Sequence, residues 1–156
     1  MKEHHYQTTT RWVGNLGAGT RDYKAYSRNH DILFPGKAVL PGSSDPAFRG
    51  DPARYNPEEL LVSSLSTCHM LWYLHLCAVN GIVVIDYVDE ASGVMSEDAS
   101  TGAGRFVSVT LRPRVTASSG DRSKALELHH QAHAYCFIAN SVNFPVTVEA
   151  AFEIAD

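Results

Sequence analysis

The chain has 156 residues, of which 44% are hydrophobic and 19% charged, and its formal net charge is −4. This length supports one domain with its own core and is short for two. The chain has no basic block to attract nucleic acid and no apolar run after its first charged residues to act as a signal peptide. Polar residues also interrupt its apolar stretches short of a membrane span. We therefore expect a single cytoplasmic domain over residues 1–156, with neither nucleic acid nor a membrane as a partner.

The segment before residue 55 carries signals of strands and turns. Alternating side chains predict strands at residues 6–13 and 23–28, with a turn at residues 14–17 between them. Residues 34–54 are rich in proline and glycine, which predicts an ordered loop with at most one short strand, near residues 37–40.

A long helix is the clearest element of the chain. Asn56 is a good N-cap, Pro57 suits the first helical position, and Gly81 suits the position just after the end, which predicts a helix over residues 57–80. Its apolar residues surround most of the helix, so we expect burial on several sides. In a chain of this length, such burial implies that a second subunit supplies part of the cover.

The remaining elements alternate between strands and one further helix. Strands are predicted at residues 82–88, continuing toward 90, and at residues 105–115, separated by a turn at 96–104. Asp121 can cap a helix that runs to about residue 135, and residues 137–142 predict one more helical turn. Residues 146–154 predict the last strand. This order predicts an α+β fold with antiparallel sheets around a long central helix.

Cys68 and Cys136 are the first candidates for chemistry. A peroxide-reducing thiol pair needs one thiolate activated by a nearby positive charge and a second thiol close in space. Because Cys68 falls in the middle of the long helix, its activation has to come from a side chain such as Arg49, Arg54 or Arg21. The alternative is that Cys68 is an inert buried thiol, as most free cysteines are. Cys77 lies among apolar residues and is assigned to the core.

Two further possibilities remain open at this point. His129, His133 and Cys136 are spaced four and three apart, which would place three zinc ligands on one helix face, although a solvated histidine face is the preferred interpretation. Cys68 could also be the nucleophile of a hydrolase or acyl transferase. His69 cannot then be its base, because neighbouring helical residues point about 100° apart.

Two motifs resemble a known family. The run Asn-Pro-Glu-Glu-Leu-Leu at residues 56–61 precedes Cys68, and Ala-Tyr-Cys-Phe-Ile-Ala-Asn-Ser at residues 134–141 surrounds Cys136. Together they resemble the OsmC/Ohr family of osmotically inducible and organic hydroperoxide resistance proteins. Residues 12–15 and 49–51 look like its OsmC-like branch, and the resemblance spans nearly the whole chain.

The resemblance implies a fold, an assembly and residue roles. It implies an intertwined homodimer and a thiol-dependent peroxidase, in which Cys68 is the peroxidatic cysteine and Cys136 the resolving one. Glu58 matches the glutamate that holds an active-site arginine, for which Arg49 is the first choice, then Arg21 and Arg54. Many members have proline after the second cysteine, where this chain has Phe137.

The position of Glu58 bears on the assembly. It precedes Cys68 by ten residues, which on one straight helix is about 15 Å along the axis. A glutamate that serves this thiol would therefore come from a partner subunit.

These expectations combine into one hypothesis and one rival. The hypothesis is a peroxiredoxin-like organic hydroperoxide reductase with no metal or organic cofactor, regenerated by a lipoyl-type dithiol or a small thiol. We expect an apolar substrate pocket lined by Leu65, Trp72, Phe48 and Phe137. The rival is a non-enzymatic protein of the same fold that binds an apolar ligand, or a metal through His129, His133 and Cys136.

Overall fold

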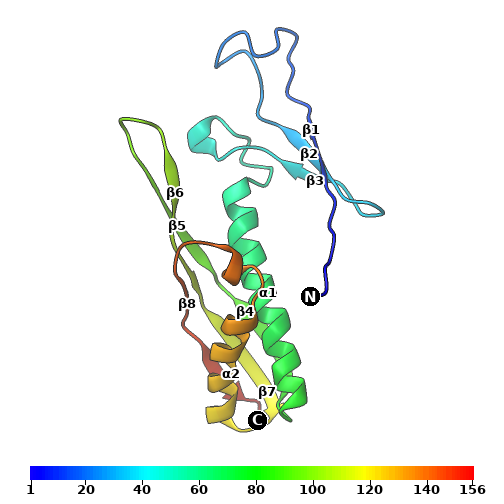
Figure 1. The fold of residues 1–156 in the computed structure, drawn as a ribbon, viewed down its shortest axis with the longest axis vertical. Helices are drawn as coiled ribbons and strands as arrows, with labels where there is room; N and C mark the ends of the chain where they lie inside the picture. The colour runs from blue at the N-terminus through cyan, green and yellow to red at the C-terminus, as the bar shows by residue number, and fades with distance from the viewer. The chain divides into compact units, whose positions relative to one another are not determined.

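The structure is a computed structural model that describes residues 1–156 (Figure 1). It contains two compact units, an N-terminal unit of residues Met1–Leu60 and a C-terminal unit of residues Leu61–Asp156. The expectation of a single domain over residues 1–156 stays a prediction.

Three short antiparallel strands form the sheet of the N-terminal unit, in the order β1-β2-β3. They are β1 (Thr9–Trp12), β2 (His30–Leu33) and β3 (Leu40–Gly42), and a 3-10 turn, η1 (Pro46–Phe48), follows. The strand predicted at residues 6–13 is confirmed as β1. The short strand predicted at residues 37–40 lies slightly later, at β3.

The strand predicted at residues 23–28 is wrong. The Arg28 guanidinium lies 4.4 Å from the ring centre of Tyr23 and 4.0 Å from that of Tyr26. It also donates hydrogen bonds to the backbone carbonyls of both tyrosines. These contacts fold the segment onto itself, so the second strand begins only at His30.

Helix α1 (Pro57–Val79) begins and ends close to where the sequence predicts. Asn56 Oδ1 accepts a hydrogen bond from the Glu59 N–H at 2.8 Å, and the Glu59 carboxylate accepts one from the Asn56 N–H at 3.2 Å, which is a capping box. At the other end Gly81 has a φ of 72°, and the Ile82 N–H donates to the Cys77 carbonyl at 3.0 Å. This left-handed glycine closes the helix.

Helix α1 is also long and apolar enough, by length and composition, to cross a membrane, contrary to the expectation from its polar interruptions. The core helix of a folded domain has the same properties. Five of its residues are buried inside the protein, namely Leu65, His69, Tyr73, Leu76 and Cys77. We therefore interpret α1 as a core helix.

Two three-stranded sheets, β4-β7-β9 and β5-β6-β8, complete the C-terminal unit. The strands are β4 (Val83–Asp89), β5 (Ser92–Glu97), β6 (Gly104–Leu111), β7 (Pro113–Ser119), β8 (Val146–Val148) and β9 (Ala151–Ile154). β4 with β7 and β5 with β6 pair antiparallel, while β8 runs parallel to β6 and β9 runs parallel to β7. The predicted α+β class is confirmed, but these two sheets are mixed rather than antiparallel throughout.

Several predicted strands are divided differently in the structure. Residues 105–115 belong to two strands, β6 and β7, because Pro113 cannot donate a ladder hydrogen bond and the Arg112 N–H donates to the Asp89 carboxylate at 2.6 Å instead. Residues 146–154 also form two strands, β8 and β9, one in each sheet. The turn predicted at residues 96–104 is shorter, because residues 92–97 pair with β6 as β5.

Helix α2 (Arg122–Tyr135) follows as predicted, with Asp121 as its N-cap. The Asp121 carboxylate accepts a hydrogen bond from the Lys124 N–H at 2.7 Å. A 3-10 turn, η2 (Ala139–Ser141), falls inside the helical turn predicted at residues 137–142. Buried residues of α1, α2 and the sheet β4-β7-β9 form one hydrophobic cluster of the core.

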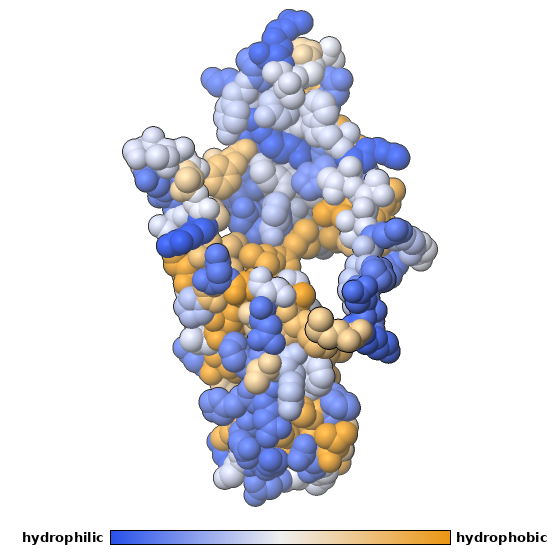
Figure 2. Space-filling view, viewed as in Figure 1, coloured by the Kyte–Doolittle hydropathy of each residue, from blue (hydrophilic) through white to orange (hydrophobic).

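Part of the apolar surface is uncovered. Figure 2 shows hydrophobic residues at the surface, and α1 contributes Leu71 and Val79, which are 63% and 65% exposed. The chain alone therefore does not bury α1 on all sides, and the expectation that a second subunit supplies further cover stays a prediction.

Helices α1 and α2 meet along an antiparallel seam of aromatic and polar contacts. The Tyr73 hydroxyl donates to the Ala125 carbonyl at 3.1 Å, and one turn earlier on α1 the His69 Nε2 lies 3.0 Å from the His129 Nδ1. The rings of Tyr73 and His129 stack at 3.8 Å between centres, and those of His69 and His129 at 5.3 Å. Both histidines are buried, with exposed fractions of 1% and 3%.

Burial lowers the pKa of both histidines. Desolvation is the largest cause in each case, and it lowers the pKa of His69 from 6.5 to about 4 and that of His129 from 6.5 to about 3. His133 lowers the pKa of His69 further while Asp89 opposes it, and His69 and His130 lower the pKa of His129. The pair is therefore neutral at neutral pH.

This pair predicts that the protein loses stability in mild acid. Because both folded-state pKa values lie below 6.5, the unfolded chain binds more protons than the folded chain once the pH falls below that value. The free energy of unfolding should fall between pH 6.5 and about pH 4, by at most about 1.4 kcal/mol per pH unit for each histidine. Urea unfolding followed by circular dichroism at several pH values measures this slope.

A matched pair of variants isolates the histidines as the cause. The double variant His69→Leu with His129→Leu should have a shallower pH dependence over this interval, whereas His75→Gln, which removes an exposed histidine, should keep the slope of the unmodified protein. An unmodified protein whose stability does not change between about pH 6.5 and about pH 4.5 would contradict the prediction.

Candidate active site

The two cysteines singled out from the sequence meet at one end of the seam between α1 and α2. Cys68 lies in the middle of α1 and is partly exposed, while Cys136 is the C-cap residue of α2 and is 1% exposed. Both thiols are free, and they are close enough for a hydrogen bond from one to the other to contribute to the pKa of Cys136. The fold therefore places side by side two thiols that are distant in sequence.

The two thiols differ in accessibility. Burial is the largest cause that raises the pKa of Cys136 above its usual range, and the neighbouring Cys68 adds to it. The Ala139 N–H acts in the opposite direction by donating to the Cys136 sulfur at 3.4 Å. Cys136 is consequently a protonated, buried thiol at neutral pH, and Cys68 is the thiol that a solute can reach.

The end of α2 fixes Cys136 in this place. Cys136 leaves the helical conformation, with φ −66° and ψ 108°, while its N–H still donates to the His133 carbonyl at 3.3 Å. Its own carbonyl accepts a hydrogen bond from the Asn140 N–H at 3.0 Å, at the start of η2. Backbone bonds on both sides therefore hold the buried thiol.

An aromatic group lies one turn after Cys68. The ring centre of Trp72 lies 5.2 Å from that of Tyr135 and 5.6 Å from that of Phe137, the second in an edge-to-face arrangement. Phe137 is 68% exposed. Phe137 thus extends the apolar surface beside the thiols.

The other two predicted pocket residues are placed elsewhere. Leu65 has an exposed fraction of 0% and packs in a core cluster with Val109 and Leu111, so it cannot line an open pocket in this structure. The physical reason is that the side of α1 that carries Leu65 packs against strand β6. Phe48 belongs to η1 of the N-terminal unit, and its role in the pocket stays a prediction.

The candidate arginines have different surroundings within the N-terminal unit. Arg54 is engaged in the fold, because its Nε donates to the Gly42 carbonyl at 2.8 Å and its Nη2 donates to the Asp31 carboxylate at 2.5 Å. Arg49 makes no ion pair, and its guanidinium lies 5.8 Å from the ring centre of Tyr23. With a φ of 65°, Arg49 is also the one non-glycine residue with positive φ. Such strained conformations are often found at functional sites.

Glu58 lies in the first turn of α1 with one carboxylate oxygen buried and without a hydrogen-bond partner. A buried carboxylate oxygen without a donor is costly, and an arginine would satisfy it. Neither Arg49 nor the exposed Arg21 forms an ion pair with it in the single chain. Glu58 and Cys68 both belong to α1, ten residues apart in sequence.

The three-ligand metal set is not assembled. No group of three or more His, Cys, Asp or Glu side chains is placed to hold a metal ion, because Cys136 turns toward Cys68 while His129 pairs with His69. The preferred interpretation of a solvated histidine face is also wrong for His129, which is buried.

The pairing of His69 with His129 was not predicted from the sequence. The available signal was the spacing of His69, Tyr73 and Leu76, which puts the histidine on a buried face of α1. The assignment of Cys77 to the core is confirmed, since it is 1% exposed and burial raises its pKa.

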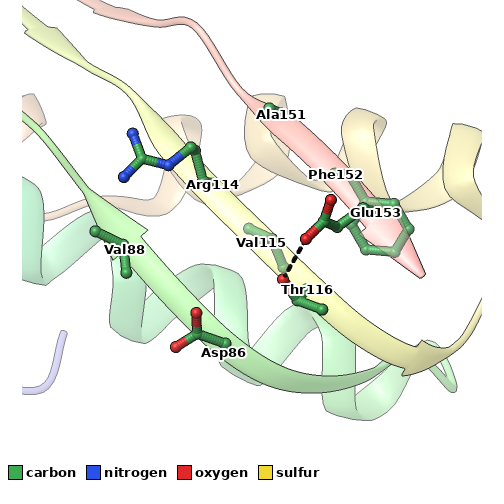
Figure 3. A pocket seen from close by; sticks show the side chains of 8 residues that line it. All are labelled: Asp86, Val88, Arg114, Val115, Thr116, Ala151, Phe152 and Glu153. Atoms are coloured by element: carbon green, nitrogen blue, oxygen red, sulfur yellow. Dashed lines mark hydrogen bonds between the residues drawn. The ribbon is translucent and has the colours of Figure 1, made fainter. Parts of the chain in front are cut away.

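A pocket of about 250 Å³ lies on the sheet β4-β7-β9. Figure 3 shows its charged residues, Asp86 on β4, Arg114 on β7 and Glu153 on β9, with the Thr116 hydroxyl donating to Glu153 at 3.1 Å. Arg114 is paired with Glu90, which lies outside the pocket, at 2.7 Å. No cysteine or histidine lines this pocket, so it offers no thiol or imidazole chemistry.

The chain is similar to known proteins over nearly its whole length. Residues 50–151 match the family model described as OsmC-like protein. The solved structure of an OsmC-like protein of unknown function from Vibrio cholerae, VCA0330, is 32% identical, covers 95% of this chain and 99% of its own, and has a TM-score of 0.84.

Two more distant relatives come from Bacillus subtilis. The organic hydroperoxide resistance protein OhrB shares the fold with a TM-score of 0.63 at 22% identity, over 96% of this chain and 98% of its own. The uncharacterized protein YmaD of strain 168 is 22% identical, over 99% of this chain and 98% of its own length.

The matched residues include Glu58, α1, Cys68, α2 and Cys136, while Arg49 lies just before them. The match also covers β4 to β8 and ends at Ala151, the first residue of β9. The chain therefore belongs to the OsmC-like protein family.

Proposed function

We propose that this protein is a thiol-dependent peroxidase that reduces organic hydroperoxides. The observation that carries the proposal is the contact between a partly exposed Cys68 and a buried Cys136 at the end of the α1–α2 seam. Membership of the OsmC-like family supports it, since solved structures of the same fold include organic hydroperoxide resistance proteins.

In the first step Cys68 reacts with the hydroperoxide. Its thiolate sulfur attacks the outer oxygen, a sulfur–oxygen bond forms, and the oxygen–oxygen bond breaks. The alkoxide takes up a proton and leaves as the alcohol, while Cys68 remains as a sulfenic acid. Trp72 and Phe137, which provide apolar surface beside the thiols, favour an alkyl hydroperoxide over hydrogen peroxide.

In the second step Cys136 resolves the sulfenic acid. Its sulfur attacks that of Cys68, a disulfide forms, and the sulfenic oxygen leaves as water with the thiol proton. A lipoyl-type dithiol or a small thiol then reduces the disulfide by exchange and is itself oxidised. No metal or organic cofactor takes part in these steps.

The charged residues of the site come from the start of α1 and the loop before it. In this proposal Arg49 stabilises the Cys68 thiolate and the departing alkoxide, and Glu58 orients Arg49. Because Glu58 lies about 15 Å along α1 from the Cys68 of its own chain, the glutamate serves the thiol of a second copy in a cytoplasmic homodimer. The unpaired buried oxygen of Glu58 and the uncovered apolar side chains of α1 support this assembly.

The thiol roles can be tested by mass spectrometry. After one equivalent of cumene hydroperoxide, the reduced protein should become lighter by about 2 Da, with the disulfide mapping to Cys68 and Cys136. Cys68→Ser should show no mass change and no peroxide consumption. Cys136→Ser should consume about one equivalent and stop at the sulfenic acid, which dimedone traps.

Cys77→Ser is the matched control, because Cys77 is a buried thiol in the same helix as Cys68. This variant should behave like the unmodified protein. If all three thiols of the unmodified protein stayed reduced, or if Cys77→Ser abolished disulfide formation, the two-thiol mechanism would be wrong.

The choice of arginine makes a separate prediction. Arg49→Ala should lower the rate of Cys68 oxidation by about 10²-fold, because a donor to the developing alkoxide is lost, and should leave thermal stability nearly unchanged. Arg54→Ala should lower the free energy of unfolding by about 2 kcal/mol, because charge-assisted hydrogen bonds are lost. Stopped-flow oxidation and urea unfolding of both variants and of Arg21→Ala distinguish an arginine that acts in catalysis from one that stabilises the fold. A normal rate of Cys68 oxidation in Arg49→Ala would exclude Arg49 as the active-site arginine.

A further inference from the structure

A second pocket of about 450 Å³ opens beside α2. α2 contributes the imidazoles of His129, His130 and His133, and the segment that carries β8 contributes apolar side chains that include Val146 and Val148. No cysteine lines this pocket. The peroxidase mechanism uses none of its residues.

Two of these imidazoles have unused nitrogen atoms. His129 Nε2 and His133 Nδ1 are both buried and have no hydrogen-bond partner, and His129 as a whole is 3% exposed. Residues four apart on a helix share one face, so the two rings can reach the same ligand. A buried polar atom without a partner requires an explanation, and a bound ion is one of the ordinary explanations.

The surroundings of His129 fit those of a metal-binding histidine. Its other ring nitrogen, Nδ1, is 3.0 Å from His69 Nε2, and its ring stacks on Tyr73 at 3.8 Å. Metal-binding histidines are usually oriented in this way by a hydrogen bond to the second ring nitrogen. When Nδ1 donates the proton of that bond to His69, Nε2 keeps a free lone pair, with which no protein group forms a hydrogen bond.

We propose that His129 and His133 form a binding site for a divalent transition-metal ion such as Zn²⁺, Co²⁺ or Ni²⁺. These ions accept imidazole nitrogen, whereas Mg²⁺ and Ca²⁺ require oxygen ligands. Since no three side chains converge on one point, the ion has two protein ligands and its other positions hold water or a small ligand in the pocket. His69 is a positioning residue that orients His129.

This site differs from the three-ligand set expected from the sequence. Cys136 is excluded because it lies against Cys68 and accepts a hydrogen bond from Ala139. The proposal is independent of the peroxidase activity and stands if that activity is absent.

The test measures Co²⁺ and Zn²⁺ binding in a protein from which competing ligands have been removed. Cys68→Ser and Cys136→Ser eliminate the two thiols of the candidate active site and leave only the buried Cys77, and His4→Ala and His5→Ala eliminate the exposed N-terminal pair. Isothermal titration should give one equivalent of bound ion per chain. The visible absorption of Co²⁺ should show nitrogen coordination without thiolate charge transfer.

Single variants in this background locate the site. His129→Gln and His133→Gln should each weaken Co²⁺ binding at least about tenfold, and His69→Gln about tenfold through loss of orientation. His130→Gln is the matched control, because His130 lines the same pocket with an exposed side chain, and it should change the affinity less than about twofold.

Circular dichroism and thermal unfolding without metal establish that each variant is folded. His133 is only partly buried, so His133→Gln decides the question if His129→Gln does not fold. The proposal is overturned if the background protein binds no ion, if binding survives His133→Gln unchanged, or if His130→Gln weakens it as much as His133→Gln.

Discussion

The antiparallel contact between α1 and α2 is the constraint on which both candidate sites depend. Moving along α1 from Cys68 to His69 and then to Tyr73, the partners on α2 are Cys136, His129 and Ala125, in descending order. One packing register therefore sets three pairs at once. A shift of α2 by one turn would separate the thiols and break the contact between His69 and His129.

The histidine contact is an unusual way to fill a helix interface. Two buried imidazoles are tolerated when both rings are uncharged and share at least one hydrogen bond. His69 and His129 meet both conditions, and the His129 ring also stacks on Tyr73. Two apolar residues at positions 69 and 129 would pack as well, and the stability of the fold would then not depend on the charge of these positions in acid. The polar pair also leaves ring nitrogens without partners on His69 and His129, which an apolar pair would avoid.

Local signals predicted the helices well and the sheets poorly. The capping box at Asn56, the left-handed Gly81 and the Asp121 cap all act within a few residues, so the sequence alone shows them. Strand boundaries depended on long-range pairing: β6 and β7 are nearly continuous in sequence but lie in different sheets, as do β8 and β9. Period-two alternation shows which side of a strand is buried and carries no information about which sheet the strand joins.

Local sequence patterns do not show long-range contacts, and this also limits what could be predicted of the candidate sites. The importance of Cys68 and Cys136 came from their resemblance to a family motif, whereas the partner of His69 lies 60 residues away on another helix and no local pattern identifies it. Consecutive residues on α1 point about 100° apart, yet Cys68 and His69 both reach α2 partners, because Cys136 stands where α2 ends and the chain turns. The end of α2 thus allows neighbouring positions of one helix to serve two separate sites, the thiols beside Trp72 and the imidazoles beside β8.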